Sequence, residues 1–318
     1  MKIVIAIDSF KGSLSSFELG EAIEKGIKRV YSDAEVKKVP IADGGEGTVE
    51  ALVDGTGGRF VDMEVKGPLM KPIDARYGIM GNDKTAVIEM ASASGLPLIK
   101  LEERNPRKTT TYGTGELIKD AIQKGCREFI IGIGGSATND AGLGMLQALG
   151  YKFFDKKGRK LGAGGEIMEQ ELGKDVAEIP GAGAAGGLGG GFLAFLEGEL
   201  RPGIDIVFEK VKLAQEIEGA DFVITGEGRI DFQSVMGKAP TGVSKLCQKY
   251  GIPVIAIAGC VADDADAVHD YGIEALFSAI NYPISLEEAM SRDRARTFVE
   301  KNSEEIFRLI RVCEKKFG

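Results

Sequence analysis

One glycine-rich segment constrains the fold of this 318-residue chain more than any other. It reads GIGGSATNDAGLG over residues 132–144 and follows directly on an apolar run at residues 129–131. An apolar strand followed by glycines and small polar residues is typical of α/β enzymes that bring bare backbone N–H groups to a phosphate. Because residues 145–149 favour a helix, the segment predicts a strand, a loop and a helix in succession.

Strand and helix patterns alternate at the start of the sequence. Residues 2–7 predict a strand and residues 16–30 a helix with apolar residues at helical spacing. A second strand at residues 34–39 and a short helix at residues 48–54 follow. This succession indicates a sheet of parallel strands with helices packed on it.

The middle of the sequence has a different pattern. Short extended runs at residues 60–65, 73–78 and 85–89 are separated by glycine and proline punctuation, which indicates antiparallel pairing. The strand and helix rhythm returns after residue 220. There, strands are expected at residues 221–225, 253–258 and 274–280, and helices at residues 241–250 and 286–316.

These patterns predict an α/β protein in which one domain interrupts another. We expect a doubly wound, largely parallel-sheet domain of the Rossmann or flavodoxin-like type, formed by residues 1–62 and 205–318. A mixed α/β domain over residues 63–204 is inserted into it.

Composition excludes several classes of protein. No apolar run approaches the roughly 20 residues that span a bilayer, and the N-terminus reads as a strand and not as a signal peptide. The net charge is −8 and no basic cluster is interleaved with aromatic residues, so nucleic acid is not an expected partner. The four cysteines are scattered, which suits a reducing cytoplasm. We therefore expect a soluble cytoplasmic protein that binds small molecules and no membrane.

The single histidine, His269, limits the chemistry that is available. A Ser-His-Asp triad or a site with several histidine ligands would depend on this one residue, which stands among aspartates in a polar stretch. We therefore expect proton transfer by Asp, Glu, Lys or Tyr and metal binding by oxygen ligands, which is the preference of Mg²⁺.

Two loops near the N-terminus carry charged residues after predicted strands. The first holds Asp8 and Lys11, and the second holds Asp43 and Glu46 among three glycines. Loops at the carboxyl ends of strands are where open α/β sheets place ligands. The simpler alternatives are that a serine near residue 13 or 15 caps the next helix, and that the second loop is a glycine turn with an acidic helix start.

Three further segments are rich in glycine, hydroxyl or charged groups. The run TTTYGTG at residues 109–115 suits either a polar ligand or a strand end with a helix cap. The run GAGAAGG at residues 181–187 matches a dinucleotide-binding spacing only weakly, so a backbone that approaches some ligand, or tight helix packing, is the better interpretation. The loop after residue 225 brings Glu227, Arg229 and Asp231 together, with Lys238 shortly after, which suits a Mg-nucleotide or a carboxylate substrate. Clustering of surface charge is the alternative for this loop.

Loops of this character, without histidines, indicate phosphoryl transfer. That chemistry depends on positioning and charge neutralisation more than on a strong base.

The same segments resemble the glycerate kinase family, of the type called glycerate 2-kinase in bacteria. In chain order, the matching motifs are DSFKGS (8–13), ADGGEGT (42–48), AVIEMASASGL (86–96), TTTYGTGEL (109–117), GIGGSATND (132–140), GAGAAGGLG (181–189), ITGEGRID (224–231) and GK (237–238). The resemblance covers nearly the whole chain. It implies phosphorylation of D-glycerate by ATP with Mg²⁺, at the 2-hydroxyl, on a two-domain α/β architecture.

The resemblance leaves two other functions open. One is a kinase for another small hydroxy acid, or a glycerate kinase that forms 3-phosphoglycerate. The other is a protein that binds nucleotides or anions without catalysis. The latter is suggested by a departure from the family, whose members usually continue after Gly165 with a long stretch bearing a CDVxNPL-like motif that this chain lacks.

Residue chemistry then suggests roles within that activity. Lys11 and Arg229 are expected to neutralise the substrate carboxylate or the transferring phosphoryl group. Asp43 or Asp231 is expected to accept the hydroxyl proton while the other helps to hold Mg²⁺, and Asp8 completes the catalytic group. The residues expected to contact nucleotide phosphates are Gly134, Gly135, Ser136, Thr138, Asn139, Asp140 and Lys238.

Overall fold

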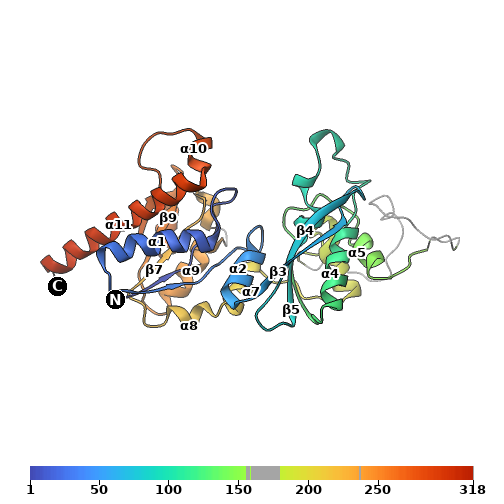
Figure 1. The fold of residues 1–318 in the computed structure, drawn as a ribbon, viewed down its shortest axis with the longest axis horizontal. Helices are drawn as coiled ribbons and strands as arrows, with labels where there is room; N and C mark the ends of the chain where they lie inside the picture. Colours follow the sequence, from blue (N-terminus) through green and yellow to red (C-terminus); the bar gives the residue numbers. More distant parts are fainter. Residues whose placement is uncertain (155–157, 159–179, 236–237, 318) are drawn as a thin grey trace. The chain divides into compact units, whose positions relative to one another are not determined.

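The structure, a computed structural model, describes residues 1–154, 158, 180–235 and 238–317 (Figure 1). The chain divides into two compact units. The first comprises Met1–Asp43, Glu50–Gly55 and Gly203–Gly318, and the second comprises Gly44–Val49 and Thr56–Pro202. No helix in the described ranges is long and apolar enough to cross a membrane.

The first unit is built on a five-stranded sheet in the order β11-β9-β7-β1-β2. Its strands are β1 (Lys2–Ile5), β2 (Glu35–Lys38), β7 (Phe222–Thr225), β9 (Val254–Ala258) and β11 (Ala275–Ser278). All neighbouring strands pair in parallel. The chain passes from β1 to β2 on one side and later returns to β7 on the other side of β1. The direction of winding therefore reverses between β1 and β7, which is where doubly wound sheets bind ligands.

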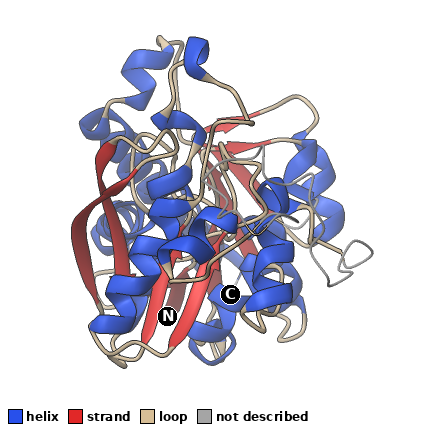
Figure 2. Ribbon diagram, turned by 90° about the vertical axis from the view of Figure 1, so that its right-hand side faces the viewer, coloured by secondary structure: helices blue, strands red, loops and turns tan. Residues whose placement is uncertain are grey.

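Helices cover this sheet on both faces, as a parallel sheet requires (Figure 2). The elements around it are α1 (Ser16–Val30), α2 (Thr48–Thr56), α7 (Gly203–Lys210), α8 (Leu213–Ile217), α9 (Ala239–Gln248), α10 (Leu286–Met290) and α11 (Arg292–Phe317), the short strands β8 (Arg229–Ile230) and β10 (Cys260–Val261), and the 3₁₀ turns η4 (Phe232–Val235) and η5 (Ala265–Tyr271). Helices α1 and α11 pack against each other (Figure 1). Their apolar faces meet Ile3, Ile5 and Ile224 of the sheet in one core.

The start of α1 follows from its sequence. The Ser15 hydroxyl accepts the N–H of Glu18, and the Glu18 carboxylate accepts the N–H of Ser15, which together form a capping box. The expected capping role therefore belongs to Ser15, and Ser13 is left for another role.

The second unit contains a four-stranded sheet in the order β3-β4-β5-β6. Its elements are β3 (Arg59–Lys66), β4 (Pro72–Ile79), β5 (Thr85–Glu89), β6 (Glu128–Gly132), α3 (Ala91–Ser94), α4 (Tyr112–Gln123), α5 (Leu143–Ala148), α6 (Ala184–Phe195), η1 (Leu96–Leu98) and η2 (Leu101–Glu103). The expected antiparallel pairing is confirmed for β3, β4 and β5, whereas β5 and β6 run parallel. The predicted fold class, a parallel-sheet domain together with a mixed α/β one, is confirmed.

The structure corrects three details of the prediction. The predicted limit between residues 62 and 63 falls inside β3, which pairs with β4 along its whole length, whereas the second unit comprises Gly44–Val49 and Thr56–Pro202. The run at residues 109–115, interpreted as a loop or a strand end with a helix cap, contains the start of α4, which begins at Tyr112. The single helix expected over residues 286–316 is two helices, because Ser291 adopts an extended conformation between α10 and α11.

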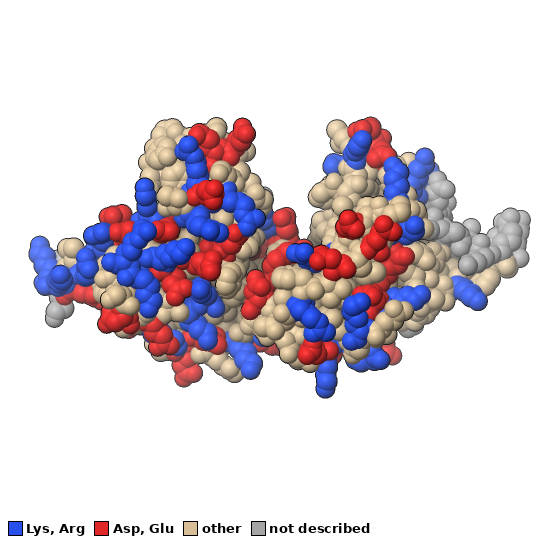
Figure 3. Space-filling model, in the orientation of Figure 1, with Lys and Arg blue, Asp and Glu red and all other residues tan. Residues whose placement is uncertain are grey.

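The surface on the face shown in Figure 3 mixes charges of both signs. Around α1 and α11, for example, Arg29 lies 3.0 Å from Glu304, and Arg308 lies 2.6 Å from the same carboxylate. Such interspersed pairs do not form the continuous basic surface that nucleic-acid binding needs, among the described residues on this face.

Candidate active site

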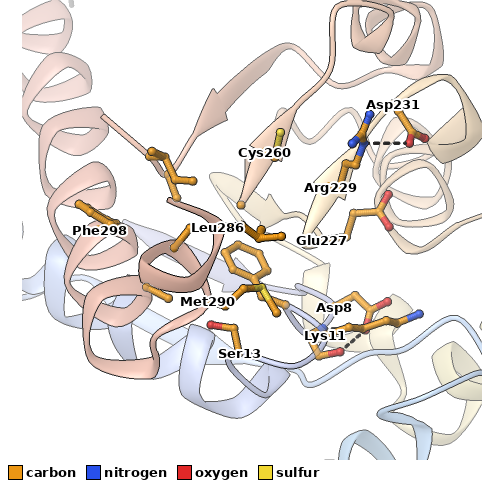
Figure 4. Close-up of a pocket in the computed structure, with 18 of the residues that line it drawn as sticks. Asp8, Lys11, Ser13, Glu227, Arg229, Asp231, Cys260, Leu286, Met290 and Phe298 are labelled. Atoms are coloured by element: carbon orange, nitrogen blue, oxygen red, sulfur yellow. Dashed lines mark hydrogen bonds and ion pairs between the residues drawn. The ribbon is translucent and has the colours of Figure 1, made fainter. Parts of the chain in front are cut away.

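Two loops meet where the winding of the first sheet reverses. Asp8 follows β1 and Glu227 follows β7, and the N–H of Asp8 donates a 2.9 Å hydrogen bond to the carbonyl oxygen of Gly226. This bond holds the two strand ends together. Figure 4 shows the side chains of Asp8, Lys11 and Glu227 near one another at this edge.

Asp8 is a buried carboxyl group with an altered acidity. Only 2 % of its surface is exposed, and burial raises its pKa from 3.8 to about 7, with repulsion from Asp43 as the next cause. A 2.7 Å hydrogen bond from the N–H of Ser9 and the charge of Lys11 oppose this shift. Asp8 can therefore exchange a proton near neutral pH.

Glu227 is a second buried carboxyl group, to which the sequence analysis gives no role of its own. Burial raises its pKa, and the charge of Asp43 adds to the shift. The hydroxyl of Ser234 and the ammonium of Lys238, 3.5 Å away, oppose it. The only sequence signal for Glu227 is its place directly after a strand, because its burial depends on the distant β1 loop.

The predicted catalytic residues all lie in the first unit. Lys11 is 3.8 Å from Asp43, and Arg229 is 3.4 Å from Asp231. One pocket of about 470 Å³ is lined by Asp8, Lys11, Arg229, Asp231 and Lys238. Asp43 does not line it but forms an ion pair with Lys11, which does. The structure thus brings together residues that the sequence placed in three separate loops.

The pocket has two chemically different ends (Figure 4). Charged side chains occupy the end at β1 and β7, whereas Leu286, Met290 and Phe298 of α10 and α11 lie at the other end. Phe10, which is buried, also lines the pocket.

The acidic residues at the charged end suit a divalent cation that is held by one or two carboxylates, and not one that is held by three protein side chains. In the described ranges, no group of three His, Cys, Asp or Glu side chains is placed to hold a metal ion. Mg²⁺, however, is usually held by one or two carboxylates together with substrate phosphates and water. Asp43 and Glu227 repel Asp8 and each other, so a cation beside them would relieve that repulsion.

The glycine-rich loop at residues 132–144 lies in the second unit, at the end of β6. Ser136, Thr138 and Asn139 line a pocket of about 440 Å³ together with Arg104 and Asn105. Gly134 and Gly135 are exposed, so their backbone is open to a ligand. These residues can offer N–H, hydroxyl and amide groups to an anion.

Asp140 has a different place from the rest of that loop. Its side chain is fully buried, and it accepts hydrogen bonds from the N–H groups of Thr111, Gly142 and Gly144 at 2.8, 3.2 and 3.1 Å. The hydroxyls of Thr110 and Thr111 donate to it as well. The Asp140 carboxylate therefore orders the loop, and this placement argues against its predicted contact with a nucleotide phosphate.

The glycines at residues 181–187 pack against the same loop. The carbonyl oxygen of Gly186 accepts the N–H of Ala141 at 2.9 Å. A Cβ atom on Gly186 would lie 2.1 Å from the carbonyl oxygen of Thr138. Tight backbone packing, one of the two interpretations of this run, is therefore what the structure shows, and no dinucleotide fingerprint is needed to explain it.

Comparison with known proteins agrees across sequence and structure. A sequence model described as the glycerate kinase family matches residues 3–171 and 165–311. The chain is 42% identical to the glycerate kinase of Bacillus subtilis (strain 168), with all of both chains covered, and 43% identical to the glycerate 2-kinase of Escherichia coli (strain K12), with 91% and 93% covered. A crystal structure from Salmonella typhimurium LT2, of a protein provisionally named glycerate kinase 2, superposes with a TM-score of 0.87 at 38% identity and covers 99% of both chains.

The comparisons also bear on the stretch that the sequence analysis finds missing. The alignment with the Bacillus subtilis protein extends over 382 positions, although this chain has 318 residues. The family match divides at residues 165–171, the region in which the stretch is expected.

Proposed function

Because the chain belongs to the glycerate kinase family, we propose that it transfers the γ-phosphoryl group of ATP to the 2-hydroxyl of D-glycerate. The observation that carries the proposal is the charged end of the first unit's pocket, where Asp8, Lys11 and Arg229 line one cavity. The name of the Escherichia coli relative, glycerate 2-kinase, supports the choice of the 2-hydroxyl.

Lys11 and Arg229 supply the positive charge that the reaction needs. Lys11 lies 3.8 Å from Asp43, and Arg229 lies 3.4 Å from Asp231. We propose that these two cations bind the carboxylate of glycerate and the equatorial oxygens of the transferring phosphoryl group. Phosphoryl transfer depends on neutralising the negative charge on those oxygens.

Asp8 is the group that we propose as acceptor of the hydroxyl proton. The sequence offers Asp43 and Asp231 for this role, but in the structure each lies next to a cation. Asp8, with a pKa of about 7, can take a proton at neutral pH.

Asp43 and Glu227 are the residues that we propose to hold Mg²⁺. Glu227 takes the place of the expected Asp231, whose carboxylate lies beside Arg229. When bound, Mg²⁺ neutralises the oxygens of the β- and γ-phosphates. The two proposed ligands are also ion-pair partners of lysines, Asp43 of Lys11 and Glu227 of Lys238, so the positive charges would lie together.

For the second unit's loop we propose the role expected from the sequence, except at Asp140. We propose that the backbone N–H groups of Gly134 and Gly135 and the side chains of Ser136, Thr138 and Asn139 contact phosphate oxygens, without the Asp140 carboxylate. We also expect the reaction to take place in the cytoplasm, where the free thiols Cys260 and Cys313 stay reduced.

The test is ADP release from ATP, Mg²⁺ and D-glycerate, followed in a coupled assay, with the product identified by ³¹P NMR. Turnover to 2-phosphoglycerate supports the proposal. A 3-phospho product, or faster turnover of another hydroxy acid, would keep a kinase but change its regiochemistry or substrate. ATP binding without turnover of any hydroxy acid would leave a nucleotide-binding protein without catalysis.

A further inference from the structure

The apolar end of the first unit's pocket has no use in glycerate chemistry. Leu286 and Met290 line it although 78 % and 39 % of their surfaces are exposed. A three-carbon hydroxy acid has almost no apolar surface with which to cover such side chains. A ligand that covers this end must carry an apolar part of its own.

The pocket also has a polarity gradient that matches one class of ligand. Figure 4 shows Leu286, Met290 and Phe298 at one end and Glu227, Arg229 and Asp231 at the other. A nucleoside triphosphate has the same gradient, with a flat aromatic base at one end and a chain of anions at the other. The pocket volume of about 470 Å³ is within the range of roughly 300–1,000 Å³ typical of small-molecule sites.

A polar atom between the two ends points to the same ligand. The hydroxyl oxygen of Ser13 is buried and has no hydrogen-bond partner among the described residues, yet Ser13 lines the pocket. Buried polar groups are nearly always hydrogen-bonded, so this hydroxyl is suited to a ligand atom. A ribose hydroxyl or a ring nitrogen of a base can fill that position.

We propose that the first unit binds the nucleoside of ATP in this pocket, with the base against Phe10, Leu286, Met290 and Phe298 and the polyphosphate toward Lys11, Arg229 and Lys238. The proposal rests on the proposed function only in the choice of ATP as phosphoryl donor. Aromatic and thioether side chains suit a heteroaromatic ring, since both make favourable contacts with π systems. The site lies where doubly wound sheets bind nucleotides, at the reversal between β1 and β7.

The test separates base binding from phosphate binding. Isothermal titration calorimetry measures the Kd of Mg-AMP-PNP and of Mg-tripolyphosphate for the parent chain and for the double variant Leu286→Ser/Met290→Ser. We expect the Kd of AMP-PNP to rise about tenfold, which corresponds to about 1.4 kcal/mol, and the Kd of tripolyphosphate to stay unchanged.

The matched control is Leu309→Ser/Val312→Ser, which removes two exposed apolar side chains of α11 that do not line the pocket. We expect it to leave both Kd values unchanged. If the double variant of α10 loses its fold, Ser13→Ala is measured in its place, and its AMP-PNP Kd should rise about threefold.

The outcomes for this pocket and for the proposed function are distinct. An unchanged AMP-PNP Kd, or an equal loss for both ligands, in the folded variants overturns the nucleoside pocket even where D-glycerate is phosphorylated. A selective loss of AMP-PNP binding supports the pocket, including in a parent chain that does not turn over D-glycerate.

Discussion

The hydroxyl of Ser234 donates a 2.6 Å hydrogen bond to the buried carboxylate of Glu227 and accepts the N–H of Asp231 at 3.2 Å. This one side chain therefore connects the acidic end of the pocket with the loop that carries Arg229 and Asp231. It also opposes the raised pKa of Glu227, because a donated hydrogen bond stabilises the ionised form.

Ser234→Ala should weaken the use of Mg²⁺. Without the hydroxyl the pKa of Glu227 rises further, so protons compete better with the metal, and the Mg²⁺ concentration for half-maximal rate should rise several-fold. The free energy of unfolding should fall by about 1–3 kcal/mol because two buried groups lose their partner. Ser234→Thr should restore both. The control is Ser303→Ala, an equally buried serine whose hydroxyl donates within α11; a Mg²⁺ requirement that shifts in both variants would contradict the assignment.

Asp8→Asn should slow turnover strongly and stabilise the protein at high pH. Folding raises the pKa of Asp8 from 3.8 to about 7, so ionisation of this carboxyl opposes folding. The free energy of unfolding of the parent therefore falls progressively as the pH rises between those two values. The variant should match the parent near pH 4 and exceed it by up to about 4 kcal/mol near pH 8, measured by urea unfolding in EDTA. Its kcat should fall at least about 100-fold.

The control for Asp8 is Asp74→Asn, which changes an exposed carboxyl of β4. It should alter neither the rate nor the pH dependence of stability. A stability difference between Asp8→Asn and the parent that is the same near pH 4 and near pH 8 would show that the carboxyl is not destabilised by burial.

Arg229→Met should lower kcat/KM for D-glycerate by about 100-fold, as loss of a group that neutralises transition-state charge does. Arg229→Lys should recover only part, because an ammonium lacks the planar fork of the guanidinium. The control is Arg76→Met, which removes an exposed Arg76–Asp62 pair of the second unit and should leave kcat/KM unchanged. Full activity of Arg229→Met would remove this residue from the catalytic group.

Asp140→Asn should destabilise the second unit without touching a ligand. The amide would present N–H groups toward the N–H donors of Thr111 and Gly144, at a cost of about 3 kcal/mol in the free energy of unfolding. Asp62→Asn, at an exposed ion pair, should cost less than about 1 kcal/mol. An Asp140→Asn protein that is as stable as the parent but binds AMP-PNP weakly would restore Asp140 as a phosphate contact.

The sequence predicts an element well where local chemistry decides it. The predicted helix over residues 16–30 begins and ends as α1 does, because Ser15 and Glu18 form a capping box that is readable in the sequence. The start of α4 is missed since Gly113 reads as a loop residue. A Cβ atom there would lie 1.9 Å from the carbonyl oxygen of Lys66, so the glycine serves close packing of a helix on β3.

The site is predictable to a similar degree. That Asp8, Lys11 and Arg229 lie in one pocket follows from their places after strands, because the carboxyl ends of parallel strands meet at one edge. The burial of Glu227 and the network around Asp140 depend on segments that are distant in the sequence, so no local pattern shows them. The apolar end of the pocket could not be predicted either. The sequence of α10 reads as the first turns of one long helix, and only the structure shows that Ser291 separates α10 from α11.

The pairing of β1 with β7 has a consequence for how this chain is made. Ile3 of β1 stands opposite Phe222 of β7, so β1 is synthesised long before the strand that pairs with it on that side. During that interval the apolar side chains of β1 lack the core that α11 later completes, while the residues of the second unit are already present. Domains generally fold as units during synthesis. The second unit can therefore fold before the sheet of the first unit is complete, because β7 and α11 follow it in the chain.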